Sequence, residues 1–181
     1  MKIENSVVLI TGANRGIGLA FARALLARGA RKVYAAARDP STVTLPGVQA
    51  LQLDVTKPEE IAAVALHAGD VTLVINNAGI AQPGGFLAPD SDAVSRRIFE
   101  TNFFGVHRVC RAVLPHMRAR HAGRIVNMSS LGGLVTVPFQ GMYCASKYAL
   151  EAYTQALRME VRPFGIHVAM IEPGDFATGF T

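Results

Sequence analysis

The chain has 181 residues, 50% of them hydrophobic and 17% charged, which is typical of one folded domain spanning residues 1–181 and excludes a disordered protein. No apolar run approaches the ~18 residues of a membrane span and the N-terminus lacks the features of a secretory signal, so we expect a cytoplasmic protein without a membrane partner. The formal charge of +5 does not predict nucleic-acid binding, because its one dense stretch, residues 115–124, fits a solvated helix end.

Six short apolar runs are the predicted strands, at residues 6–11, 32–37, 48–55, 71–77, 123–129 and 165–172. Longer patterns of helical period lie between them, at residues 17–29, 58–69, 90 to about 120, and from residue 143 onward. Strands that alternate with helices predict an α/β fold: a doubly wound parallel sheet with helices on both faces, in three layers. Runs such as VVLIT are continuously apolar, as expected of strands buried on both sides. Pro115 should bend or end its helix.

The first predicted strand leads into a glycine-rich turn, TGANRGIG at residues 11–18, and then directly into a helix. Glycines allow a tight turn and let backbone amides approach a pyrophosphate, whose charge the N-terminus of the following helix stabilises. In such folds ligands bind beyond the carboxyl ends of the strands, where this turn lies. The turn therefore predicts a dinucleotide site.

The residues after the second predicted strand favour NADP over NAD. NAD-binding chains commonly place an acidic residue there, which accepts a hydrogen bond from the ribose 2′-hydroxyl. Here the strand ends in Ala37 and Arg38 follows, while Arg15 lies in the glycine-rich turn. Two guanidinium groups are suited to a 2′-phosphate. Asp39 lies one position after the place where NAD-binding chains have their acidic residue. Its alternative role is to form a turn with Pro40.

The stretch YCASK places a phenol and an ammonium, Tyr143 and Lys147, four positions apart at the start of a helical pattern. Together with later apolar positions they form one helical stripe: Tyr143, Lys147, Leu150, Thr154, Leu157 and Val161. A cation near a phenol stabilises the phenolate, so the pair is suited to act as a base. Taken alone, these residues favour the other explanation, a packing tyrosine beside a lysine whose ammonium reaches solvent.

Several motifs together resemble the short-chain dehydrogenase/reductase family over nearly the whole chain. They are TGANRGIG, the pair Asp54 and Val55, NNAG at residues 76–79, Asn102, Ser130, YCASK, and the pair Pro173 and Gly174. Residues 129–147 are most similar to the steroid-type and carbonyl reductases of that family. The resemblance implies a Rossmann-type fold and an NADP-dependent oxidoreductase that transfers a hydride to or from a small hydrophobic carbonyl or alcohol, with NAD the less expected cofactor.

The resemblance also implies a role for each site residue. Tyr143 becomes the acid/base, and Lys147, helped by the positive charge of an oxidised nicotinamide, lowers its pKa. Ser130 holds the substrate oxygen, with Ser129 as a competing candidate that the spacing to Tyr143 disfavours. Asn102 holds a water that links Lys147 to solvent, although an asparagine that bends a helix is the structural alternative.

The implied cofactor-binding residues surround the same strand ends. Asp54 would contact the adenine, although alone it is equally suited to cap a helix. The backbone after the fourth strand would pack against the adenosine ribose. The full implied set is Gly12, Asn14, Arg15, Gly16, Ile17, Gly18, Arg38, Asp54, Val55, Asn77, Ala78, Gly79, Tyr143, Lys147, Pro173 and Gly174.

Family members normally continue beyond the Pro173–Gly174 pair with a segment that covers the substrate, whereas this sequence stops at residue 181. We therefore expect a single dinucleotide-binding and catalytic domain without that segment, with weak turnover. The resemblance implies pairing through helices 102–118 and 143–161, and we expect a homodimer rather than a tetramer. An NADP-binding sensor or scaffold with little turnover is the alternative function.

Two other kinds of site are not supported by the sequence. Cys110 and Cys144 have no metal-ligand spacing and no export context, so we expect free thiols and no metal site. A hydrolase built on Ser130 would need a histidine with an orienting acid at a neighbouring strand end, and none is predicted there.

Overall fold

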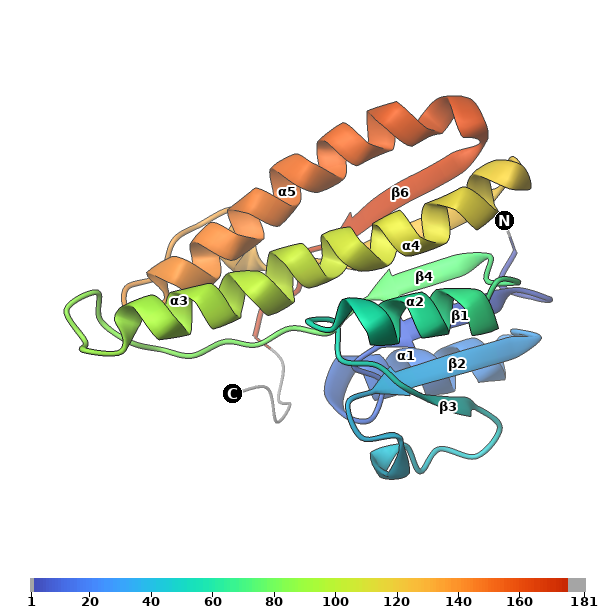
Figure 1. The fold of residues 1–181 in the computed structure, drawn as a ribbon, viewed down its shortest axis with the longest axis horizontal. Coiled ribbons are helices and arrows are strands. Elements are labelled where there is room, and N and C mark those ends of the chain that lie inside the picture. The colour runs from blue at the N-terminus through green and yellow to red at the C-terminus, as the bar shows by residue number, and fades with distance from the viewer. Residues whose placement is uncertain (1, 176–181) are drawn as a thin grey trace.

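A computed structural model describes residues 2–175, in which six parallel strands form one sheet (Figure 1). The strands are β1 (Val7–Thr11), β2 (Lys32–Ala37), β3 (Gln49–Gln52), β4 (Leu73–Asn76), β5 (Gly123–Met128) and β6 (Ile166–Ile171). Their order across the sheet is β3-β2-β1-β4-β5-β6. Each lies within a predicted run, so the predicted α/β fold with a doubly wound parallel sheet is confirmed.

Helices cover both faces of this sheet (Figure 1). The α-helices are α1 (Gly16–Ala27), α2 (Pro58–His67), α3 (Ser91–Phe99), α4 (Val106–Ala119) and α5 (Gly141–Val161). A π-helical turn, η2 (Glu100–Gly105), joins α3 and α4 into one long helix, and three 3-10 turns are η1 (Pro40–Thr42), η3 (Leu131–Gly133) and η4 (Arg162–Phe164). One apolar cluster joins α1 to the sheet and a second joins α2, α4 and α5 to its other face.

The strand order predicts which edge of the sheet binds a ligand. From β1 the chain adds β2 and then β3 on one side, and then crosses to the other side of β1, where it adds β4, β5 and β6. In sheets of this order the ligand crevice lies beyond the carboxyl ends of the strands, at the β1–β4 reversal. Strands β1 and β4 are buried along their whole length, which explains their continuously apolar sequences.

The predicted stripe of α5 is confirmed, because every one of its six residues, from Tyr143 to Val161, is buried. The prediction for Pro115 is wrong where it allowed the helix to end, since α4 continues through it to Ala119. A proline inside a helix costs about 3 kcal/mol. Burial of Val113 and Met117 on either side of Pro115 offsets that cost and holds the last turn against the sheet.

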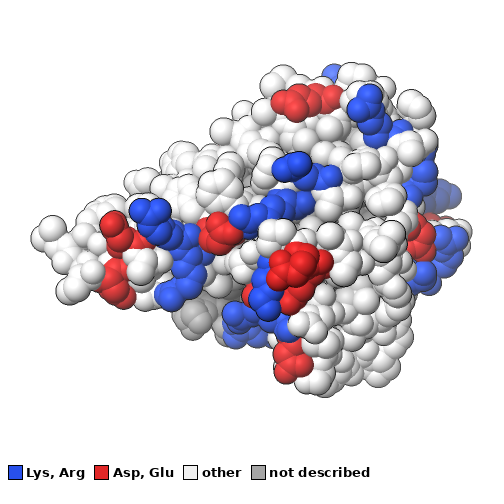
Figure 2. Space-filling view, in the orientation of Figure 1, with Lys and Arg blue, Asp and Glu red and all other residues white. Residues whose placement is uncertain are grey.

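The basic stretch at the end of α4 is used in packing. The Arg118 guanidinium lies 4.4 Å from the Phe164 ring centre. Arg120 donates to the carbonyl oxygens of Gly69 and Val71. Figure 2 shows acidic and basic side chains interspersed on the face that carries α2, α3 and α4. Within residues 2–175, no helix has both the length and the apolar character to cross a membrane.

Replacing Leu150, which is fully buried between α5 and the sheet, should test the packing of this face. Leu150→Ala should lower the free energy of unfolding by about 2–5 kcal/mol, because it removes apolar contact and leaves a cavity. Urea denaturation measures the change. Leu66→Ala on the exposed face of α2 is the control, and an equal loss in the two variants would contradict the packing described here.

Candidate active site

The glycine-rich turn folds tightly at the carboxyl end of β1. Gly12 and Gly16 have φ of +66° and +55°, which favour glycine. A Cβ on Gly18 would lie 2.2 Å from the carbonyl oxygen of Gly12 and 2.6 Å from Asn77 Nδ2. The first turn of α1 is thus packed directly on the loop. No side chain caps that helix and its first turn has no acidic residue, which leaves its N-terminus suited to an anion.

Thr11 and Asn77 fasten this turn to the end of β4. Thr11 Oγ1 accepts hydrogen bonds from the backbone N–H groups of Asn77 (3.0 Å) and Ala78 (2.9 Å). In return Asn77 Nδ2 donates to the carbonyl oxygens of Thr11 and Gly12, both at 3.0 Å. These four bonds join the glycine-rich turn and the predicted NNAG segment into one rigid unit.

The end of β2 carries a basic side chain, and the carboxylate that follows it in the sequence is already engaged. Arg38 is exposed directly after β2. Asp39 Oδ1 accepts hydrogen bonds from the backbone N–H (2.9 Å) and the hydroxyl (2.6 Å) of Ser41. Asp39 is therefore the N-cap residue of η1. These bonds hold the pKa of Asp39 below its usual value. Asp39 therefore has the turn role that the sequence offered as its alternative.

Asp54 and Val55 follow β3 and shape the outer wall of the crevice. Asp54 Oδ1 accepts from the backbone N–H (2.9 Å) and hydroxyl (2.7 Å) of Thr56. Burial alone would raise the pKa of Asp54, but these bonds and the nearby cations Arg38 and Lys57 hold it below its usual value. The N-cap of α2 is Lys57, so Asp54 closes the preceding turn and does not cap the helix.

Val55 fixes the position of the π-helical turn. A Cβ on Gly105, the last residue of η2, would lie 2.7 Å from Val55 Cγ2. The glycine therefore lets η2 lie directly against the segment after β3. This contact positions Asn102, in the middle of η2, over the end of β4.

Asn102 is buried and its amide is fully engaged. Its Oδ1 accepts from the backbone N–H of Ile80 (2.8 Å), and its Nδ2 donates to the Ile80 carbonyl (2.9 Å) and to Ser146 Oγ (3.2 Å). A Cβ on Gly79 would lie 3.4 Å from Asn102 Oδ1 and 3.8 Å from Lys147 Nζ. Asn102 thus lies in a π-helical turn beside Gly79, and its expected role of holding a water that links Lys147 to solvent stays a prediction.

Ser130, Tyr143 and Lys147 meet where β5 ends and α5 begins. Ser130 lies at the start of η3, and a hydrogen bond links it to the Tyr143 hydroxyl. Lys147 Nζ donates to the carbonyl oxygen of Met128 at 2.8 Å and lies 5.7 Å from the centre of the Tyr143 ring. Lys147 is only 5% exposed, which rules out the alternative of an ammonium in solvent. Ser129, the competing candidate, is buried beside Gly133.

Burial shifts the pKa of both groups of the pair. Burial raises the pKa of Tyr143, and the hydrogen bond with Ser130 only partly opposes this, while Cys144 adds to it. The expectation that Lys147, together with an oxidised nicotinamide, lowers the pKa of Tyr143 stays a prediction. Burial also lowers the pKa of Lys147, to about 8, an effect that Glu151 opposes. Close to neutral pH the lysine is therefore mostly charged, and above pH 8 mostly neutral.

Pro173 and Gly174 close the site from the β6 side. The Leu131 N–H donates to the Pro173 carbonyl at 3.1 Å, and the Ser129 N–H donates to the Ile171 carbonyl at 2.8 Å. A Cβ on Gly174 would lie 3.2 Å from the Leu131 side chain. The Pro-Gly pair therefore lies against η3, beside Ser130.

Three groups at the site were not among the predicted residues. Thr11 joins the turn to β4, Ser146 accepts from Asn102, and the Met128 carbonyl binds Lys147. A buried threonine at the end of an apolar strand was a detectable signal. A backbone carbonyl that binds a side chain leaves no mark in the sequence. Both cysteines are buried and free, as expected.

Comparison with known proteins gives concordant matches. The family described as short chain dehydrogenase matches residues 6–181. The chain is 41% identical over 183 residues to a 3-ketodihydrosphingosine reductase of Bacteroides thetaiotaomicron, with 99% of this chain and 67% of that protein covered. It is 40% identical over 190 residues to human 17-beta-hydroxysteroid dehydrogenase type 6, with 99% of this chain and 59% of that protein covered.

Solved structures agree with these relatives. A short chain dehydrogenase from Burkholderia cenocepacia in complex with NADP has a TM-score of 0.94 and 36% identity, and 99% of this chain and 76% of that chain are covered. A short chain dehydrogenase/reductase from Burkholderia phymatum in complex with NAD has a TM-score of 0.91 and 31% identity, with 99% and 69% covered. The chain thus spans about 59 to 76% of these proteins.

The two hydrogen bonds that Thr11 Oγ1 accepts from the segment after β4 predict a stability effect. Thr11→Val keeps the shape but leaves the N–H groups of Asn77 and Ala78 without their acceptor. Each unpaired buried donor costs about 1–3 kcal/mol, so urea denaturation should detect a loss of a few kcal/mol. Thr11→Ser keeps the acceptor and is the control. Equal stability of the valine and serine variants would show that these bonds do not hold the turn.

Proposed function

The chain belongs to the short-chain dehydrogenase family, and from that membership we propose that it is an oxidoreductase that interconverts an alcohol and a ketone with NADP(H). The observation that carries the proposal is the grouping of Ser130, Tyr143 and Lys147 at the end of β5, beside Asn102 and the glycine-rich turn. The sheet brings them together, because β1, β4 and β5 are neighbouring parallel strands whose carboxyl ends share one edge.

The protein's own residues handle the proton and the substrate oxygen. When bound, the dinucleotide accepts or returns the hydride of the substrate's carbinol carbon. Tyr143 takes the hydroxyl proton in the oxidation direction and gives it back in the reduction direction. Ser130, already within hydrogen-bond reach of Tyr143, also holds the substrate oxygen. The charged form of Lys147 favours the tyrosinate, so Tyr143 works as a base best where Lys147 keeps its proton.

The dinucleotide would lie across the ends of β1, β2 and β4. The uncapped N-terminus of α1 suits the pyrophosphate. Arg15 and Arg38 come after neighbouring strands and suit a 2′-phosphate. Asp39, the carboxylate closest in sequence, already accepts hydrogen bonds from Ser41 in the η1 cap, which makes it less suited to bind a ribose hydroxyl. This arrangement supports NADP over NAD.

The rim of the site suits an uncharged, hydrophobic substrate. The loop before α3 and the loop before α5 lie beside Ser130 and Tyr143 and expose large apolar side chains. The Gly84 N–H donates a hydrogen bond to the Phe139 carbonyl (2.8 Å), which joins the two loops. Residues 71–89 and 125–146 contain no charged side chain. The names of the two curated relatives, a sphingoid ketone reductase and a steroid dehydrogenase, agree with such a substrate. The exposed apolar residues are Phe86, Leu87, Leu131, Leu134, Val135, Val137 and Phe139.

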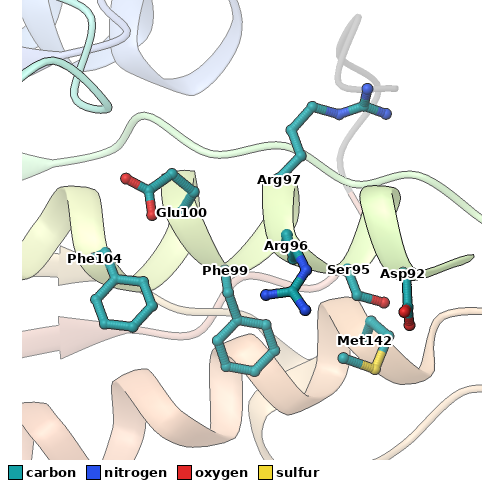
Figure 3. A pocket seen from close by; sticks show the side chains of 8 residues that line it. All are labelled: Asp92, Ser95, Arg96, Arg97, Phe99, Glu100, Phe104 and Met142. Atoms are coloured by element: carbon teal, nitrogen blue, oxygen red, sulfur yellow. The ribbon is translucent and has the colours of Figure 1, made fainter.

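A second copy of the chain would fit the face formed by α3, η2 and α5. A hollow of about 590 Å³ lies there (Figure 3), and neither Tyr143 nor Lys147 is among the residues that line it. Its apolar lining comes from Phe99, Phe104 and Met142, and charges of both signs border it. A surface that carries both signs can complement itself across a two-fold axis. We therefore propose a homodimer through helices 102–118 and 143–161.

The chemistry is tested by Tyr143→Phe, which keeps the buried ring and removes the proton. Turnover of ketones with NADPH should fall by about 100-fold or more, while the Kd for NADPH measured by fluorescence stays nearly constant. Tyr148→Phe is the control, because Tyr148 is exposed on the same helix. Turnover retained in the Tyr143 variant would overturn the assigned role.

Cofactor choice gives a second test. NADPH should bind at least about tenfold more tightly than NADH, because loss of a bidentate phosphate contact costs more than about 1.4 kcal/mol. Ala37→Asp should narrow or invert this preference by placing a carboxylate near the 2′-phosphate. Ala37→Asn matches its size without the charge and should keep the preference. Comparable dissociation constants for the two cofactors in the unmodified protein would refute the NADP assignment.

A further inference from the structure

Glu151 is a buried carboxylate with no role in the proton transfer or in substrate binding. It lies on the inner face of α5, one turn beyond Lys147, and is 7% exposed. Side chains four positions apart on a helix are neighbours. Glutamate is almost never this buried unless it is paired. Yet among the described residues no ion-pair partner lies within bonding distance of it, and its Oε1 accepts no hydrogen bond.

The 3-10 turn η3 holds this carboxylate inside the protein. A Cβ on Gly133 would lie 3.1 Å from Glu151 Oε1, 3.2 Å from Glu151 Cγ and 2.8 Å from Ser129 Oγ. Only glycine therefore lets the backbone after Ser130 lie so close to α5. The same turn that presents Ser130 to Tyr143 covers Glu151.

Glu151 is also the charged group that acts on Lys147. On α5 the other titratable groups near the lysine are Tyr143 and Cys144, both buried, and burial raises the pKa of Tyr143. Residues 71–89, which include β4 and most of the loop that follows it, and residues 125–140, which run from within β5 past η3, contain no charged residue. In the long helix Glu100 pairs with Arg108 at 2.6 Å, at the partly exposed surface. Burial lowers the pKa of Lys147 and Glu151 raises it, and the net result is a pKa of about 8.

We propose that Glu151 is a positioning residue that acts through Lys147: its carboxylate keeps the buried ammonium charged next to Tyr143. The inference rests on the proposed function, in which a charged Lys147 favours the tyrosinate. It extends that function by adding a residue that touches neither substrate nor dinucleotide. The consequence is that Glu151 sets the alkaline limit of activity.

The direction of the effect is set by the titration of a cation. Lys147 loses its proton as the pH rises through its pKa of about 8, so activity should fall over that range. Without the carboxylate the lysine loses its proton at lower pH. Glu151→Gln should therefore move the alkaline limb of the kcat profile down by about one pH unit, the size of effect typical of a nearby opposite charge. Below pH 6 the two proteins should turn over at similar rates.

Three further variants separate this role from a structural one. Glu151→Asp keeps the charge and should keep the profile close to that of the unmodified protein. Glu160→Gln removes an exposed charge from the same helix and should leave the profile unchanged. Glu151→Met replaces the carboxylate by an apolar side chain of similar length, and gives the same test if the glutamine variant does not fold. A purely structural role would lower stability and turnover equally at all pH values, and that outcome would overturn the proposal.

A second readout needs no turnover. The chain has four lysines, so ¹³C-labelled lysine gives few NMR signals, and Lys147→Met identifies the one of interest. In the protein without dinucleotide, the Lys147 signal should titrate about one pH unit lower in Glu151→Gln than in the unmodified protein. An unchanged titration midpoint would refute the proposal. If no ketone is reduced but the midpoint moves, the proposed reaction is wrong and the Glu151–Lys147 coupling stands.

Discussion

The hydrogen bond from Lys147 Nζ to the Met128 carbonyl fixes the arrangement on which the site depends. It ties the first turns of α5 to the end of β5 and keeps an ammonium inside the protein. A buried cation is unfavourable unless it is bonded and compensated. The carbonyl supplies the bond and Glu151 supplies the opposite charge. Because Tyr143 lies one turn before Lys147 on α5 and Ser130 lies just beyond the end of β5, the same bond also sets their positions.

The rest of the site is assembled around the same edge by backbone contacts that need small residues. Gly18, Gly105 and Gly133 each let a turn or helix lie against a neighbour at a distance that a Cβ would prevent. Thr11 and Asn77 join β1 to β4, and Asn102 joins η2 to the segment after β4 and to α5. Strands far apart in the sequence thus place their ends together with little freedom, as a reaction that depends on orientation requires.

Much of this was predictable from the sequence. The apolar runs gave all six strands, and the stripe that begins at Tyr143 gave the buried face of α5, because burial on both sides of a parallel sheet and on one side of a helix leaves periodic patterns. The motif residues come together at one edge of the sheet, where the carboxyl ends of the strands lie. Asn102 illustrates the limit, since no sequence pattern predicts that its amide joins a π-helical turn to Ile80 and Ser146.

The features that could not be predicted from the sequence depend on burial and on backbone atoms. The acidity of Tyr143 is set by desolvation and by the hydrogen bond with Ser130, neither of which spacing along a helix specifies. The continuation of α4 through Pro115 depends on Met117 packing beneath it. The burial of Glu151 leaves no mark in the sequence, because a glutamate on a helix is normally exposed and the close approach of Gly133 that covers it depends on the fold.

We propose above all that the protein, through the site at this edge of the sheet, catalyses hydride transfer between a dinucleotide and a hydrophobic carbonyl compound. The most direct measurement uses NADPH labelled with deuterium at nicotinamide C4 and a panel of hydrophobic ketones, with mass spectrometry of the products. The account predicts an alcohol that carries one deuterium on its carbinol carbon. Tight binding of NADPH by calorimetry with no deuterated alcohol from any ketone of the panel would contradict it.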